Sequence, residues 1–121
     1  MNERKQVLFY RTSSGFCPVE EFLNALPGKI AKRVTWTLEM IREIDRVPDI
    51  YFKKLAGSAE IWECRVQSGS NAYRILCFFA RHSTLILTNG FAKKSRKTPA
   101  REIALAERYR QDYFKGRCAD G

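Results

Sequence analysis

Three charged residues in the middle of the chain have types and spacing that suit phosphate chemistry. Glu63 and Arg65 stand two positions apart in a strand-like segment, so their side chains share one face. Arg74 interrupts the apolar run 73–79, where a charge is costly unless it is paired or lies in a cleft. A guanidinium on a rigid strand can clamp a phosphate bidentately. The pattern indicates a salt bridge between Glu63 and Arg74, a phosphoryl-transfer site, or both in turn.

A basic segment follows the last apolar stretch and begins with an aromatic ring. Four of the residues from 93 to 97 are cations, and Phe91 precedes them. Nucleic-acid-binding surfaces combine cations for phosphates with aromatic rings for base stacking. The residues that we expect to bind RNA are Lys53, Lys54, Phe91, Lys93, Arg96 and Lys97.

The charge of the chain is unevenly distributed. The formal net charge is +9, and residues 53–97 alone contain nine Lys and Arg against two Glu. The segments before and after are nearly balanced. An unbalanced cluster repels itself unless a polyanion offsets it. We therefore expect nucleic acid or an acidic protein segment as the partner.

The residues that are missing restrict the chemistry. The chain has one histidine, His82, and no carboxylate cluster of the kind that holds Mg²⁺ for two-metal hydrolysis. Four cysteines, at 17, 64, 77 and 118, form no CxxC pair, and we interpret them as small buried residues plus one free thiol near the C-terminus. We expect no metal and no cofactor. Any RNA cleavage would use the 2′-hydroxyl of the RNA as nucleophile.

Apolar periodicity predicts an α+β domain over residues 1–121, with the order β-α-α-β-β-β-α. Strands are expected at 7–10, 61–67, 73–80 and 84–91. Helices are expected at 18–26, at 29–44, and from Thr98 and Pro99 to about Gly116. The sheet should be small and mostly antiparallel, with two N-terminal helices, one C-terminal helix and strand 73–80 at its centre.

Some local features complete these expectations. The turn 68–71 is longer than a two-residue hairpin needs. Thr98 should cap the last helix with its hydroxyl. Trp36 and Met40 should widen the apolar surface of the second helix, so that it packs on more than one neighbour, and Tyr109 and Tyr113 should belong to the core. No apolar run approaches the ~18–20 residues of a membrane span, and no signal peptide is apparent, so we expect a cytoplasmic protein without a membrane partner.

Six short segments stand out when they are taken together and in order: 18–23 (PVEEFL), 52–57 (FKKLAG), 61–66 (IWECRV), 73–76 (YRIL), 90–94 (GFAKK) and 97–99 (KTP). With these segments, the chain resembles the RelE/HigB-type toxins of bacterial type II toxin-antitoxin systems. More narrowly, it resembles the phage-derived branch of the RelE/ParE superfamily. The resemblance extends from about Val7 to Phe114.

The resemblance implies a compact RelE-like sheet with helices on one face and ribosome-dependent mRNA cleavage, which arrests translation. It also implies a cognate antitoxin, often a HigA-like helix-turn-helix protein. By match, Arg74 acts on the scissile phosphate, Arg65 falls on a basic position of the preceding strand, and Lys94 falls on a cation after the last strand. Glu63 stands where RelE has a basic residue, which leaves the general base open. The expected catalytic group is Glu63, Arg65, Arg74 and Lys94.

Two other interpretations remain open. ParE-type toxins share this architecture but poison DNA gyrase by contact, without cutting RNA. An inactive relative would only bind its antitoxin.

Overall fold

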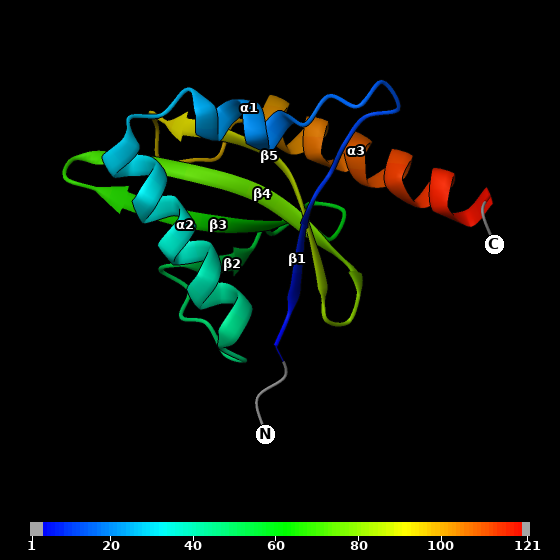
Figure 1. The fold of residues 1–121 in the computed structure, drawn as a ribbon, viewed down its shortest axis with the longest axis horizontal. Coiled ribbons are helices and arrows are strands. Elements are labelled where there is room, and N and C mark those ends of the chain that lie inside the picture. The colour runs from blue at the N-terminus through cyan, green and yellow to red at the C-terminus, as the bar shows by residue number, and fades with distance from the viewer. Residues whose placement is uncertain (1–3, 120–121) are drawn as a thin grey trace.

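Five strands form one sheet in the order β1-β5-β4-β3-β2, with three helices packed against it (Figure 1). The structure is a computed structural model that describes residues 4–119, with side chains described up to residue 116. The elements are β1 (Gln6–Phe9), α1 (Pro18–Asn24), α2 (Gly28–Glu43), β2 (Phe52–Lys54), β3 (Trp62–Ser68), β4 (Asn71–Arg81), β5 (Thr84–Lys93) and α3 (Ala100–Ala119). The expected α+β class is confirmed.

The sheet is mostly antiparallel, and the apolar strand β4 lies at its centre, as predicted. β1 pairs with β5 in parallel, whereas the other neighbours pair antiparallel. The three-residue edge strand β2 has no counterpart in the predicted order. Its sequence, Phe-Lys-Lys, is too short to show a period of two. It pairs with β3, which would otherwise present unpaired backbone groups at the edge of the sheet.

The turn between β3 and β4 is tighter than predicted. Ser68 pairs with Asn71, so only residues 69 and 70 connect the two strands. Gly69 has a φ of 60°, which glycine adopts without the steric cost of a Cβ and which two-residue hairpins require. This short turn sets the register, and the register places Arg65 directly opposite Arg74.

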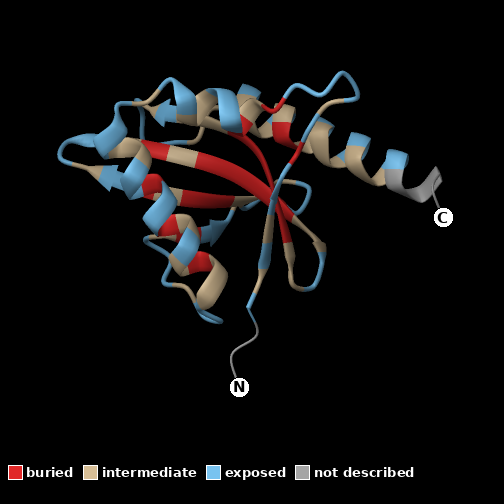
Figure 2. Cartoon of the chain, viewed as in Figure 1, coloured by how far each residue is buried: buried red, intermediate tan, exposed pale blue. Residues whose placement is uncertain are grey.

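Helices cover both faces of the sheet, which corrects the expectation of helices on one face. α1 and α2 pack around a first core that contains Val34 and Ile75. α3 packs on the other face, around a second core that contains Leu76 and Ala106. Successive residues of β4 enter the two cores alternately, and Figure 2 shows the buried residues along this strand. A strand that is apolar on both faces requires a covering layer on each.

The aromatic residues of the helices divide between core and surface. Tyr109 and Tyr113 pack against the second core, as predicted. Trp36 does not join the first core, and 58% of its surface is exposed. Met40 packs against that core, and Trp36 instead contacts the ring of Tyr51, so the apolar surface of α2 does extend beyond a single neighbour.

The cysteines behave as predicted where the structure describes them. Cys64 and Cys77 are buried in the first core, with their sulfur atoms 3.7 Å apart, and Cys17 is buried at the start of α1. Cys118 lies outside the residues whose side chains are described.

The last helix begins later and ends later than predicted. The carbonyl oxygen of Pro99 accepts hydrogen bonds from the backbone N–H groups of Glu102 and Ile103, at 3.0 and 3.2 Å. Pro99 therefore precedes the helix, and Thr98 lies one position too early to cap it. The helix continues past Gly116 to Ala119. Within residues 4–119, no helix is long and apolar enough to cross a membrane.

α1 packs closely on β5 at a glycine. A Cβ built on Gly90 would lie 2.4 Å from Cδ2 of Phe22, closer than van der Waals contact allows. Phe22 packs against the first core, so its ring has little room to move. The missing side chain of Gly90 thus permits the contact between α1 and the sheet.

We expect Gly90→Ala to lower the free energy of unfolding by about 1–3 kcal/mol, because the added methyl overpacks this contact. Urea unfolding followed by circular dichroism measures the change. Gly28→Ala is the matched control, since nothing lies within 4 Å of its Cβ position. That variant should keep the stability or raise it by up to about 1 kcal/mol. Equal stabilities of the two variants would contradict the packing argument.

Candidate functional site

The carboxylate of Glu63 is fully buried on β3 and has partners at both oxygen atoms. Oε1 accepts a hydrogen bond from Nε of Arg65 at 3.0 Å and lies 3.4 Å from Nε of Arg74. Oε2 accepts a hydrogen bond from the hydroxyl of Thr98. A buried carboxylate is tolerated only when it is paired in this way. The predicted ion pair between Glu63 and Arg74 is therefore present.

The two arginines would repel each other without this carboxylate. Arg65 and Arg74 occupy directly opposite positions of β3 and β4, where like charges destabilise a sheet. Their side chains are only 26% and 12% exposed, so water screens the repulsion weakly. A further hydrogen bond of 3.2 Å joins Arg65 to the carbonyl oxygen of Asp49. Glu63 therefore neutralises one unit of charge at a point shared by two guanidinium groups.

Arg74 has fewer hydrogen-bond partners than Arg65. Its NH1 group donates to the carbonyl oxygen of Tyr73 at 3.0 Å. Its Nε is buried and makes no hydrogen bond within the described part of the chain, although it lies close to Glu63. The pKa of Arg74 lies below the usual arginine value, because burial and the nearby Arg65 lower it more than Glu63 raises it. An incoming anion would supply the acceptor that this donor lacks.

Two lysines share this face of the sheet. Lys53 of β2 stands opposite Glu63, and Lys93 of β5 stands opposite Ala72, two positions from Arg74 along β4. Burial and the nearby Arg74 lower the pKa of Lys93, which Glu63 partly opposes. We call Lys53, Glu63, Arg65, Arg74 and Lys93 the sheet cluster. With four cations and one carboxylate, it is a strongly positive surface held by backbone pairing.

Thr98 is a site residue that the sequence did not reveal as one. It precedes α3, and its hydroxyl reaches across the face of β3 to Glu63, a contact that spans 35 residues of sequence. Its position before a helix made it look like a cap. The sequence indicates such a partner only through Glu63, because a glutamate in a buried strand needs a hydrogen-bond donor for each of its oxygens.

The other predicted site residues lie at varying distances from the sheet cluster. Lys94, Arg96 and Lys97 are exposed in the segment between β5 and α3, so Lys94 has no contact with the buried carboxylate among the described interactions. Phe91 packs against the second core. Lys54 points to the other face and forms a 2.9 Å ion pair with Glu60.

We expect Glu63→Gln to lower the free energy of unfolding by about 2 kcal/mol, because it leaves two partly buried arginines without a counter-charge. The value is set below that of a fully buried pair since both guanidinium groups retain some contact with water. Chemical denaturation measures it. Glu60→Gln is the control, because its ion pair with Lys54 is exposed, and it should change the stability little. An unchanged or higher stability of Glu63→Gln would refute the role of the carboxylate.

Comparison with known proteins supports one assignment. The family model described as "Phage derived protein Gp49-like (DUF891)" matches residues 21–111, which include every member of the sheet cluster and Thr98. No curated protein matches the chain. The match covers well over half of the sequence and agrees with the resemblance to the phage-derived branch. The chain belongs to the Gp49-like family of phage-derived proteins, which is a RelE/toxin-like family.

Proposed function

We propose that this protein is the toxin of a type II toxin-antitoxin pair and cleaves mRNA on the ribosome. The observation that carries the proposal is the pair of arginines opposed on β3 and β4 and joined through one buried carboxylate. Guanidinium groups fixed on a sheet are suited to stabilise the charge that develops on a phosphate during cleavage. Membership of a RelE/toxin-like family supports the same conclusion.

The reaction follows from an exchange of partners at Glu63. Before substrate binds, the carboxylate neutralises Arg65 and Arg74. A phosphate of the RNA then becomes the partner of both arginines, which releases Oε1 of Glu63. The released carboxylate takes the proton of the 2′-hydroxyl, and the 2′-oxygen attacks the phosphorus. The bond to the 5′-oxygen breaks, leaving a 2′,3′-cyclic phosphate on one fragment and a 5′-hydroxyl on the other.

Lys93 is the best placed group to protonate the leaving 5′-oxygen. It lies on the face of the sheet that carries the arginines, and its lowered pKa makes its ammonium a better acid than an ordinary lysine. Lys94 is exposed, beyond the end of β5. We therefore give the acid role to Lys93, and we give docking on RNA to Lys94 together with Arg96 and Lys97.

Two partners follow from this mechanism. The site has a weak base and strong electrostatics, so free RNA should be a poor substrate, and a ribosome that holds the mRNA in position would supply the missing orientation. In the same proposal, a cognate antitoxin, such as a HigA-like helix-turn-helix protein, covers the positive surface until it is degraded.

A non-catalytic toxin is the second candidate, and one observation favours it. Both oxygens of Glu63 are engaged, so the carboxylate has no free position to act as a base until its partners move. A protein that acts by contact, as ParE-type toxins do on DNA gyrase, would need no such movement. Mapping of mRNA 5′ ends after induction separates the two, because only an endoribonuclease produces new ends within translated messages.

We expect Arg74→Ala to abolish growth arrest and the new mRNA ends, with cleavage reduced about 100-fold or more through loss of charge stabilisation. Arg81→Ala is the matched control, since Arg81 is an exposed arginine at the far end of the same strand. Circular dichroism of both purified variants verifies that they are folded. Growth arrest by folded Arg74→Ala at the wild-type level would exclude this site.

We expect Lys93→Arg to reduce cleavage about 100-fold, because an arginine keeps the charge but does not release a proton. The pH profile gives a second readout. An acid must be protonated to act, so the wild-type rate should fall as pH rises through the pKa of Lys93, below the ordinary lysine value of about 10.4. This alkaline decline should be absent in Lys93→Arg and retained in Lys94→Arg. The opposite pattern would return the acid role to Lys94.

A further inference from the structure

The outward side of α2 carries an aromatic ring surrounded by cations. Lys29, Lys32, Arg33 and Trp36 occupy positions i, i+3, i+4 and i+7, so they form one stripe along the helix. They line a hollow of about 390 Å³. Trp36 is the most exposed of the large aromatic residues, at 58%. The stripe combines a flat apolar surface with three positive charges.

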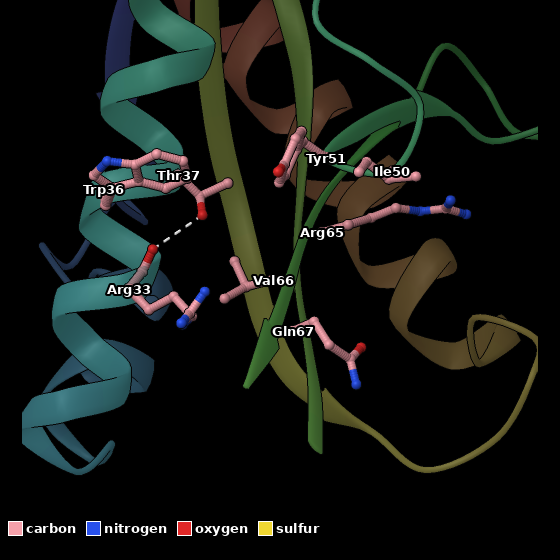
Figure 3. Close-up of a pocket in the computed structure, with 8 residues that line it drawn as sticks. All are labelled: Arg33, Trp36, Thr37, Ile50, Tyr51, Arg65, Val66 and Gln67. Atoms are coloured by element: carbon pink, nitrogen blue, oxygen red, sulfur yellow. Dashed lines mark hydrogen bonds between the residues drawn. The ribbon is translucent and has the colours of Figure 1, made fainter. Parts of the chain in front are cut away.

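A second hollow of about 380 Å³ adjoins the first, between α2 and the edge of β3 (Figure 3). Arg33 and Trp36 line both hollows. Tyr51 contributes its ring, which meets the ring of Trp36 edge to face, with centroids 6.4 Å apart. This contact supports Trp36 from one side in a defined orientation and leaves its surface accessible to a planar ligand.

Within the described residues, the three cations of the α2 stripe lack counter-charges. None of the residues that line the two hollows is Asp or Glu. The second half of α2 differs, because there Arg42 is paired with both Glu39 and Glu43. In the described structure, Lys29, Lys32 and Arg33 form no ion pair. The charges in the second half of α2 therefore neutralise one another, whereas those in the first half are available to a binding partner.

The two adjoining hollows together form what we call the α2 groove. We propose that the α2 groove binds single-stranded RNA, with a base stacked on Trp36 and phosphates at Lys29, Lys32 and Arg33. Cations around an accessible aromatic ring are what single-stranded nucleic acid requires. A protein partner fits less well, because the centres of protein interfaces are depleted of lysine. The proposal deepens the function above and rests on it.

The groove and the sheet cluster lie on opposite sides of one strand. Arg65 belongs to the wall of the second hollow, but its side chain points away from α2 (Figure 3) and contacts Glu63 on the other face. RNA that passes around this edge of the sheet can reach both sites. The α2 groove would then hold nucleotides next to the cleaved bond and position them.

The test measures binding of a fluorescent 2′-O-methyl RNA of about eight nucleotides by anisotropy. The methyl group blocks the attacking hydroxyl, so binding is measured whether or not the protein cleaves RNA. Trp36→Ala should bind about ten-fold more weakly or worse, and Trp36→Phe should retain most of the affinity because it can stack. Since Trp36 is exposed, neither substitution should alter the thermal unfolding temperature much.

Charge is tested separately through salt dependence. Arg33→Gln should lower the slope of log Kd against log salt by about 0.7, the value for one phosphate contact on a single strand. Arg108 is an exposed arginine on α3, so Arg108→Gln is the matched control and should leave the slope unchanged. Wild-type affinity and slope in both Trp36→Ala and Arg33→Gln would overturn the proposal.

A glutamate-rich peptide serves as the competing probe. Failure of this peptide to displace the RNA supports an RNA groove. Displacement of the RNA, with peptide binding that also depends on Trp36, would overturn the proposal in favour of an acidic protein partner. These outcomes are independent of Arg74→Ala, so loss of the α2 groove and loss of the proposed cleavage activity can be told apart.

Discussion

One buried carboxylate holds the candidate site together. Glu63 receives two guanidinium groups and a hydroxyl from three segments of the chain: Arg65 comes from its own strand, Arg74 from β4 and Thr98 from the segment before α3. The register of the hairpin forces the two arginines into opposition, and only a negative charge between them makes that arrangement stable. A phosphate can replace the carboxylate because it offers the same kind of acceptor to the same donors. In the proposed function, the feature that stabilises the protein without RNA would therefore also select an anionic substrate.

The surface charge is organised on two levels. The sheet cluster is fixed by backbone pairing, whereas Lys94, Arg96 and Lys97 lie on an exposed connecting segment. A rigid group can stabilise a reacting phosphate, since its orientation does not have to be found at the moment of reaction. Exposed lysines contribute long-range attraction that salt screens. The α2 groove adds a third surface, which lies on the other side of β3 from the sheet cluster.

Much of the fold could be predicted from the sequence, because β3 has side chains that alternate with a period of two and β4 is a nearly continuous apolar run bounded by turn residues. The same period of two placed Glu63 and Arg65 on one face. Register was harder, since it depends on whether the turn at Gly69 uses two residues or four. β2 was too short to show a pattern, and Thr98 belongs to the site through a contact with no local signature. The basic stripe of α2 was hidden because seven acidic residues balance the eight cations of residues 1–52 in a count along the chain. The resemblance identified the family but not the covering of both sheet faces, which follows from an apolar strand with two sides.

The contact between Thr98 and Glu63 has a consequence for how the protein folds. It closes a loop of 35 residues, and β3, β4 and β5 must all be in place before the hydroxyl can reach the carboxylate. Contacts this distant along the chain pay their loop-closure entropy before they return any stability, so they form late. A chain in which β5 has not yet joined the sheet therefore carries both arginines but lacks the third partner of Glu63. Completion of the contacts at Glu63 follows formation of the meander β3, β4 and β5, so the candidate site forms together with the sheet and not ahead of it.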